Sequence, residues 1–258
     1  MNTAIDKLKR IINNRVVGLI ARGGSLEELE KRIEEYKDLD ICWASLNLFT
    51  PAEDFILKKI NKTLSIVSDC TNLSNRDYFE PNVRRPRLER FLARQEDNLL
   101  QISNTVIADL EYTKQHDILT TYKDKIITID QVFTGEGYSQ DLWKAPPNSI
   151  TLLLASLIAG HAKKIIMFGY DGFNGDNNLA INTYYKEYLE RDERVKATGR
   201  FQVGSLVTDS RDFNRRWNDI YELYKQTYKS NTEVVNCSPS TMFTCIRRID
   251  YDNIKNEL

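Results

Sequence analysis

The chain has 258 residues, of which 41% are hydrophobic and 28% are charged. This composition supplies enough apolar surface for a folded core and excludes a chain that is mainly disordered. Its 36 lysines and arginines nearly balance 37 aspartates and glutamates, so the basic excess typical of a general nucleic-acid-binding protein is missing. No apolar run reaches the ~18 residues of a membrane-spanning helix, and the N-terminus lacks a signal-peptide pattern. We therefore expect a cytoplasmic protein without a transmembrane segment.

Apolar runs alternate with amphipathic segments over the first 70 residues. The run VVGLIA is typical of a strand buried on both faces of a parallel sheet, and the charged segment after it has helical periodicity. Thr50, Pro51 and Glu53 together indicate a capped helix start. The predicted elements in order are a helix over 3–15, a strand over 16–21, a helix over 26–36, a strand over 41–45, a helix from Thr50 and a strand over 64–69.

The same alternation returns in the second half. The predicted elements there are a nearly all-apolar helix over 149–160, a strand over 163–168, a helix over 211–229, a strand over 232–238 and a helix beginning at Pro239. Between the halves, residues 73–145 show a looser pattern, with helical sequence to about residue 104 and an apolar segment over 125–129. The sequence predicts one Rossmann-like α/β domain over 1–258, with a doubly wound, mostly parallel sheet and 73–145 as a lid or insertion.

Ligands of open parallel sheets bind beyond the carboxyl ends of the strands, which draws attention to the loop Arg22-Gly23-Gly24-Ser25. Its glycines permit close approach of a ligand, the next helix offers unpaired amides, and Arg22 adds an anion donor. The alternative is a tight turn in which Ser25 caps the helix and forms a capping box with Glu28.

A second candidate loop follows the strand over 163–168. Its carboxylates, Asp171 and Asp176, could bind a cation or a ribose hydroxyl, or could belong to a solvated turn. Ser149 begins the helix predicted over 149–160, and Ser238 precedes the helix predicted at Pro239; at both starts a cap and a phosphate site use the same free amides. The four cysteines Cys42, Cys70, Cys237 and Cys245 form no Cys-x-x-Cys pair, so neither a zinc knuckle nor a disulfide framework is predicted.

Three segments together resemble a known superfamily. IARGGSLEEL resembles the loop of metal-independent bacterial sialyltransferases that use CMP-sialic acid, and of related 6-hydroxymethylpterin diphosphokinase-like domains. SITLLLASLIAGHAKKIIMFGYDGF resembles their buried helix and the strand ending in Gly-x-Asp, and NCSPSTM resembles their final strand and turn. Residues 73–145 carry no such likeness.

The resemblance implies a nucleotide site built from loops far apart in the chain. It implies nucleotide-binding roles for Gly23, Gly24, Ser25, Ser45, Asn47, Ser149, Gly169, Asp171, Phe173, Ser238 and Ser240, to which the anion-donor argument above adds Arg22. Two departures stand out. Arg22 replaces the family's asparagine, and the region of Thr208–Ser210 lacks the family's histidine base.

A carboxylate is therefore the expected catalytic base, and Asp171 and Asp209 are the candidates. Asp209 lies just before the helix predicted over 211–229, where the family places its base. His161 follows a buried helix and is expected to be structural, whereas nothing in the sequence singles out His116.

The favoured function is a nucleotide-sugar-dependent glycosyltransferase, sialyltransferase-like, acting in bacterial surface glycan synthesis. It would use a nucleotide-sugar donor and a glycan acceptor and need no metal or other cofactor; the oligomeric state stays open. One alternative is a pterin-type pyrophosphokinase in which Asp171 and Asp176 bind Mg-ATP. The other is a non-catalytic nucleotide-binding protein with the same fold.

Overall fold

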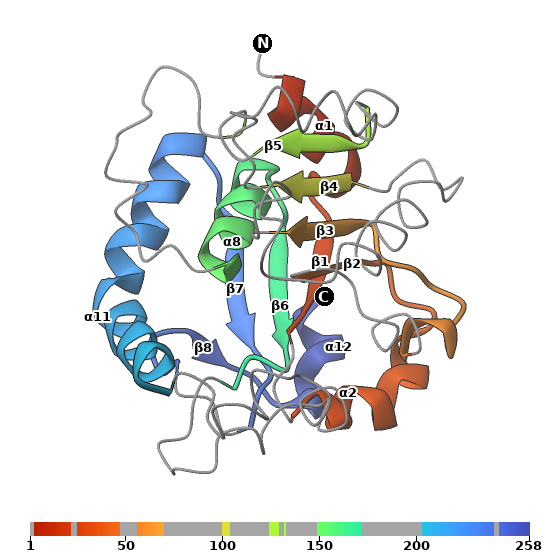
Figure 1. The fold of residues 1–258 in the computed structure, drawn as a ribbon. Coiled ribbons are helices and arrows are strands. Elements are labelled where there is room, and N and C mark those ends of the chain that lie inside the picture. Colours follow the sequence, from red (N-terminus) through yellow and green to blue (C-terminus); the bar gives the residue numbers. More distant parts are fainter. Residues whose placement is uncertain are drawn as a thin grey trace, which may run out of the picture.

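The computed structural model describes residues 3–21, 25–46, 56–69, 100–103, 124–128, 132, 149–171, 203–239 and 243–258 (Figure 1). Within them, eight strands form one sheet in the order β5-β4-β3-β2-β1-β6-β7-β8, and each neighbouring pair is parallel. The strands are β1 (Val16–Ile20), β2 (Ile41–Leu46), β3 (Ile66–Asp69), β4 (Leu100–Ser103), β5 (Ile126–Thr128), β6 (Lys164–Phe168), β7 (Glu233–Asn236) and β8 (Arg247–Arg248).

The strand order reverses between β1 and β6. From β1 the chain builds outward through β2, β3, β4 and β5, and then returns to place β6 on the other side of β1. Strands β1 and β6 pair along their whole length, from Val16 opposite Lys164 to Ile20 opposite Phe168. A doubly wound sheet binds its ligands beside such a reversal, because the loops after the two strands leave toward opposite faces. The expected Rossmann-like α/β fold is confirmed.

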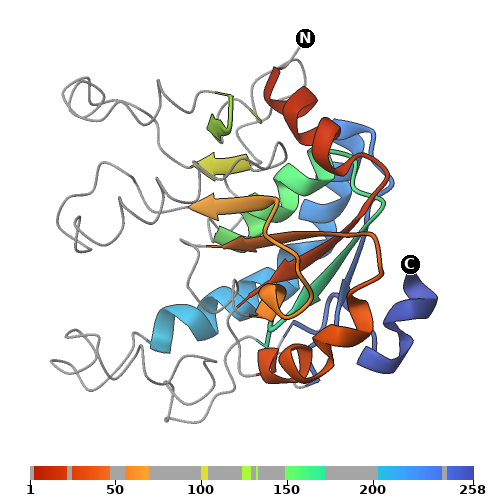
Figure 2. The ribbon, with the colours of Figure 1, turned by 90° about the vertical axis from the view of Figure 1, so that its right-hand side faces the viewer.

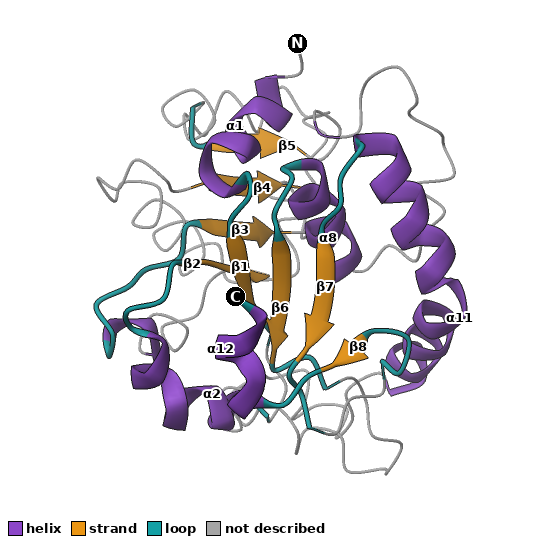
Figure 3. Ribbon diagram, turned by 180° about the vertical axis from the view of Figure 1, so that it is seen from behind, coloured by secondary structure: helices purple, strands orange, loops and turns teal. Residues whose placement is uncertain are grey.

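Alternating strand residues face two separate cores. Val17 and Leu19 belong to the core beneath α1 (Thr3–Ile12), α8 (Ser149–Ala159) and α11 (Val203–Tyr228). Val16 and Ile20 belong to the opposite core, beneath α2 (Leu26–Arg32), the 3-10 helices η1 (Ile33–Tyr36) and η4 (Tyr251–Asn253), and α12 (Ile254–Glu257). Figures 2 and 3 show α8 and α11 on one side of β6 and β7, and α12 on the other. Because both faces are covered, the strands are continuous apolar runs.

The apolar composition of α8 follows from its position. Residues 153–160 are all buried, and α8 packs against both α1 and α11. At its end, a Cβ atom added to Gly160 would lie 2.6 Å from Cδ1 of Ile12. The glycine therefore allows α1 and α8 to approach more closely than a residue with a side chain would.

Three sequence predictions are wrong in detail. The helix predicted over 211–229 begins earlier, because α11 starts at Val203. Residues 100–103, predicted as the end of a helix, form strand β4. After Pro239, which lies in a turn, the described residues 243–248 form turns and strand β8, so the predicted helix is missing there.

The segment 73–145 contributes to the sheet. Strands β4 and β5 both lie within it; β4 pairs with β3, and β5 pairs with β4, so these parts of the segment extend the sheet and do not form a lid. Its other residues, apart from 124, 125 and 132, lie outside the described residues, as does the helix start predicted at Thr50. Within the part of the chain that the structure describes, no helix is both long and apolar enough to cross a membrane.

Candidate active site

Ser25 and Asp171 meet at the carboxyl ends of β1 and β6. The backbone amide of Ser25 donates to Oδ2 of Asp171 at 2.9 Å, and the Ser25 hydroxyl donates to Oδ1 of the same carboxylate. The Asp171 residue is 8% exposed. Both carboxylate oxygens therefore receive hydrogens from a single residue, which ties the start of α2 to the loop after β6.

Ser25 does not form the capping box that its spacing from Glu28 suggested. Its backbone is helical, and its side chain makes no capping hydrogen bond. The backbone amide of Glu28 donates to the Ser25 carbonyl at 3.0 Å, whereas the Glu28 carboxylate accepts a 2.7 Å bond from Nε of Arg32. The Ser25 hydroxyl is thus directed to the sheet edge and away from its own helix.

Ser238 joins the same cluster from the end of β7. Its hydroxyl oxygen lies 3.2 Å from that of Ser25. Since the single hydroxyl hydrogen of Ser25 is directed to Asp171, the Ser238 hydroxyl is the donor of this bond. Asn236 holds Ser238 in place: its Oδ1 accepts the Ser238 amide at 2.9 Å, and its Nδ2 donates to the Tyr170 carbonyl at 3.0 Å. We call Ser25, Asp171 and Ser238 the switch-point cluster.

Gly169 allows the two loops of this cluster to approach each other. Its φ is +67°, in the left-handed region that favours glycine. A Cβ atom at this position would lie 3.0 Å from the Ala21 carbonyl oxygen and 3.2 Å from Cβ of Leu26. Next to it, the Ala21 amide donates to the Phe168 carbonyl at 2.8 Å and so extends the β1–β6 pairing by one bond. The backbone conformation and the close packing at position 169 therefore require a glycine whether or not a ligand binds nearby.

The remaining predicted site residues fall into two groups. Ser45 is completely buried at the carboxyl end of β2, and its hydroxyl donates to the Ile20 carbonyl at 3.2 Å, so it supports the strand next to the cluster. Ser149 is the first residue of α8, and its side chain is outside the described part of the structure. Also outside it lie Arg22, Gly23, Gly24, Asn47, Phe173, Asp176 and Ser240.

Asp209, the second predicted base, lies inside a helix. It is the seventh residue of α11, whereas the sequence predicted a position just before that helix. The early start of α11 accounts for the difference. The helix begins at the end of the molecule at which β6 and β7 also end (Figure 1). The position of Asp209 on the early turns of α11 therefore brings its backbone toward the carboxyl edge of the sheet; its side chain is not described.

His161 lies at the opposite edge of the sheet. It follows α8 with φ +59°, three residues before β6 begins, and its carbonyl accepts the Asn14 amide at 2.9 Å. Burial lowers the pKa of its imidazole, and the positive charge of Lys9 lowers this pKa further. This position supports the structural role expected for His161. The lowered pKa favours the neutral imidazole, whereas a helix C-terminus alone would favour the charged form.

Two residues of the site, Asn236 and Tyr251, were not predicted from the sequence. The hydroxyl of Tyr251 donates to the Ser25 carbonyl at 3.3 Å across 226 positions of the chain. Tyr251 belongs to no recognisable motif, whereas Asn236 is the first residue of the segment NCSPSTM. Asn236 lies two residues before the end of the strand predicted over 232–238, which was a signal that its amide would lie near the carboxyl edge, whereas nothing local marked Tyr251.

No protein-family model and no curated protein matched this chain.

Proposed function

We propose that this protein is a nucleotide-dependent transferase whose nucleoside binds at the switch-point cluster, and that it is a glycosyltransferase using a nucleotide-sugar donor. The observation that carries the proposal is the bonding of Ser25 to Asp171 across the reversal between β1 and β6. Polar groups that follow β1, β6 and β7 in the chain meet there, at the position where doubly wound folds bind nucleotides.

The charge of the cluster favours the sugar hydroxyls of the nucleoside over its phosphates. The Asp171 carboxylate already accepts the Ser25 amide, so this amide is not free to bind a phosphate. The carboxylate would repel a second anion, whereas its remaining lone pairs and those of the serine hydroxyls can accept hydrogens from a ribose. In this proposal the phosphates lie toward Arg22, whose guanidinium suits a bidentate phosphate contact.

In the proposed reaction, the acceptor hydroxyl attacks the anomeric carbon of the donor sugar. The bond from that carbon to the nucleotide phosphate breaks, the phosphate leaves with the electron pair, and a base takes the acceptor proton. Asp171 orients the nucleoside, because both of its oxygens already hold Ser25. Asp209 is left as the proposed base. A glycan of the bacterial surface is the acceptor class that the sequence resemblance implies.

A thermal-shift panel tests the proposal. CMP, UDP, GDP and ATP are each added with and without Mg²⁺, because a ligand of the folded state raises the melting temperature by mass action. A metal-independent shift with one of the first three supports a nucleotide-sugar transferase, and strictly Mg²⁺-dependent binding of ATP would replace it by the pyrophosphokinase. No shift with any nucleotide would overturn the proposal.

Two variants make the panel specific to the site. Asp171→Asn alters the cluster and should reduce the shift. Lys163→Gln lies at the amino edge of the sheet, where Lys163 contacts the Leu258 backbone oxygen at 2.5 Å, and should leave the shift unchanged.

A further inference from the structure

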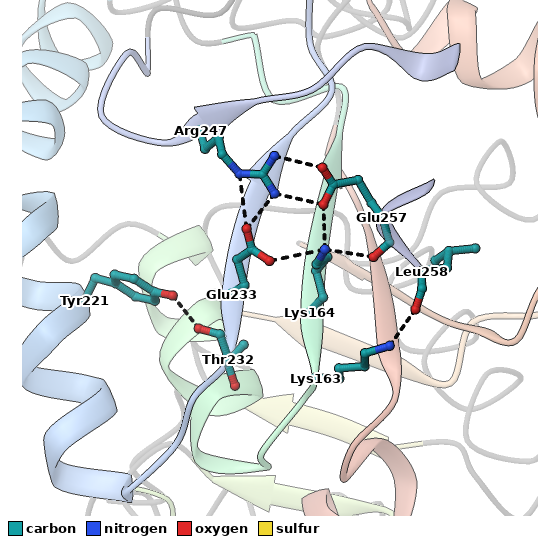
Figure 4. A network of polar contacts seen from close by, with 8 residues as sticks. All are labelled: Lys163, Lys164, Tyr221, Thr232, Glu233, Arg247, Glu257 and Leu258. Carbon is teal, nitrogen blue, oxygen red and sulfur yellow. Dashed lines mark hydrogen bonds and ion pairs between the residues drawn. The ribbon is translucent and has the colours of Figure 1, made fainter. Parts of the chain in front are cut away.

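The last ten residues cross one face of the sheet from its carboxyl edge to its amino edge. We call Ile249–Leu258 the C-terminal strap. At the carboxyl edge, the Ile249 amide donates to the Asn236 carbonyl at 3.0 Å. At the amino edge, Glu257 pairs with Lys164 at 2.5 Å (Figure 4). The strap therefore connects the cluster at one edge with a charged network at the other.

Tyr251 is the strap residue that reaches the cluster, and its side chain is held on several sides. The centroid of the Tyr251 ring lies 5.9 Å from that of Phe168, and the Arg32 guanidinium lies 6.0 Å from the Tyr251 centroid. Arg32 also pairs with Asp252, the next strap residue. Tyr251 is 7% exposed, and burial raises the pKa of its phenol. The hydroxyl therefore remains a hydrogen-bond donor at neutral pH.

Ser25 is the residue that this hydroxyl contacts. Its amide and its hydroxyl are held by Asp171, and its carbonyl accepts both the Glu28 amide and the Tyr251 hydroxyl. All the polar groups of Ser25 are thus engaged, two by the loop after β6 and one by the strap. The hydrogen bond from Tyr251 is accepted by the carbonyl of Ser25, the residue just before α2. In the sequence, Ser25 directly follows Arg22, Gly23 and Gly24.

We propose that Tyr251 is a positioning residue of the nucleotide site, and that its hydroxyl holds Ser25 in the orientation in which the switch-point cluster accepts the nucleoside. This inference rests on the proposed function for the ligand, but the positioning of Ser25 can be measured without a ligand. The strap is then part of the site in addition to covering the core.

Tyr251→Phe tests the proposal because it removes the hydroxyl and keeps the buried ring. Glu257→Gln is the matched control, since it weakens the same strap at the edge remote from Ser25. Amide hydrogen exchange of the ligand-free protein should be faster at Ser25, Leu26 and Glu28 in Tyr251→Phe and unchanged there in Glu257→Gln. Unchanged exchange at these amides in Tyr251→Phe would overturn the proposal.

Calorimetry with CMP supplies the second readout. The dissociation constant for CMP should rise about fivefold in Tyr251→Phe, as expected for one lost hydrogen bond, and remain at the wild-type value in Glu257→Gln. Equal affinities of wild type and Tyr251→Phe would overturn the role in binding. Where wild type binds none of the four nucleotides, the proposed function fails, whereas the exchange result still decides whether Tyr251 positions Ser25.

Discussion

The carboxylate of Asp171 accepts hydrogen bonds from both the backbone amide and the hydroxyl of Ser25, across 146 positions of the chain. This pair connects the loops after β1 and β6, the two strands at which the sheet reverses its order. It also supplies an internal anion for an amide that a bare strand–helix loop would leave to a ligand. We therefore expect the pair to affect both the stability of the fold and the ligand that the proposed site can accept.

Asp171→Asn should weaken both folding and nucleotide binding. An asparagine has one acceptor oxygen where two Ser25 donors now bind, so one buried donor loses its partner, at a cost of about 1–3 kcal/mol in the free energy of unfolding. Urea denaturation checks this value, and calorimetry should show at least tenfold weaker binding. Ser25→Ala is the control, because the backbone amide of residue 25 can still donate its hydrogen bond to Asp171, so this variant should destabilise the protein less than Asp171→Asn. Stability and affinity at the wild-type level in Asp171→Asn would show that this pair matters for neither.

Gly169→Ala should destabilise the fold by about 1–3 kcal/mol, because an L-residue is strained in the left-handed region. The added Cβ would also lie 3.0 Å from the Ala21 carbonyl oxygen. Thermal unfolding measures the effect.

Lys229→Gly is the control of opposite sign for this substitution. Lys229 is an exposed residue with φ +51° at the end of α11, and glycine there should leave the melting temperature unchanged or raise it. A Gly169→Ala protein as stable as wild type would show that the β1 and β6 loops can move apart without cost.

The charged network at the amino edge should stabilise the protein at neutral pH and less so in acid. Hydrogen bonds from Arg247 and Lys164 lower the pKa of Glu257 from 4.5 to about 2. Arg247 contacts both Glu257 carboxylate oxygens, each at 2.8 Å (Figure 4). A carboxylate whose pKa is lowered by folding contributes stability above its unfolded pKa and loses it as the pH falls through the folded value.

Glu257→Gln should therefore lower the free energy of unfolding at pH 7 by about 1–2 kcal/mol, and the difference from wild type should shrink between pH 4.5 and pH 2. Urea denaturation at a series of pH values gives this curve. If the difference in the free energy of unfolding between wild type and Glu257→Gln stays constant or grows as the pH falls through this range, the prediction is wrong.

Asp209→Asn should reduce turnover by a hundredfold or more once a donor is known, on the order expected for loss of a general base. His161→Gln is the control, because His161 lies at the amino edge and away from the switch-point cluster. Steady-state kinetics on folded protein give the comparison. A comparable loss in His116→Gln, with Asp209→Asn still active, would assign the base to a histidine.

Local sequence information was enough to predict the fold class. Buried parallel strands need an apolar side chain on each face, so β1, β2 and β6 could be recognised as continuous apolar runs from their own residues. The helix α8 was predicted for a similar reason: a helix that is buried on all sides is apolar all round, so its own residues are enough to recognise it. Strand β4 was missed because its four residues, LQIS, are too few to separate strand from helix periodicity.

The other wrong predictions came from sequence patterns that are compatible with two different local structures. A serine followed by a proline begins many helices and also many turns, and at Pro239 the structure has a turn. The spacing of Ser25 and Glu28 fits a capping box, yet the Ser25 hydroxyl binds Asp171. An acceptor from another part of the chain replaced the local one, and no pattern within a few residues of Ser25 could indicate that.

The composition of the site depended on tertiary structure. The alternation of strands and helices along the sequence does not determine which strands are neighbours in the sheet. Only the placement of β6 beside β1 brings Asp171 to Ser25. Ser238 and Tyr251 reach Ser25 from 213 and 226 positions away. The sequence alone therefore determined which residues are apolar enough to form the sheet and its covering helices, because burial is a property of each segment. The polar contacts at the sheet edge were decided by the folded arrangement, because a hydrogen bond requires two atoms within about 3 Å and correctly oriented.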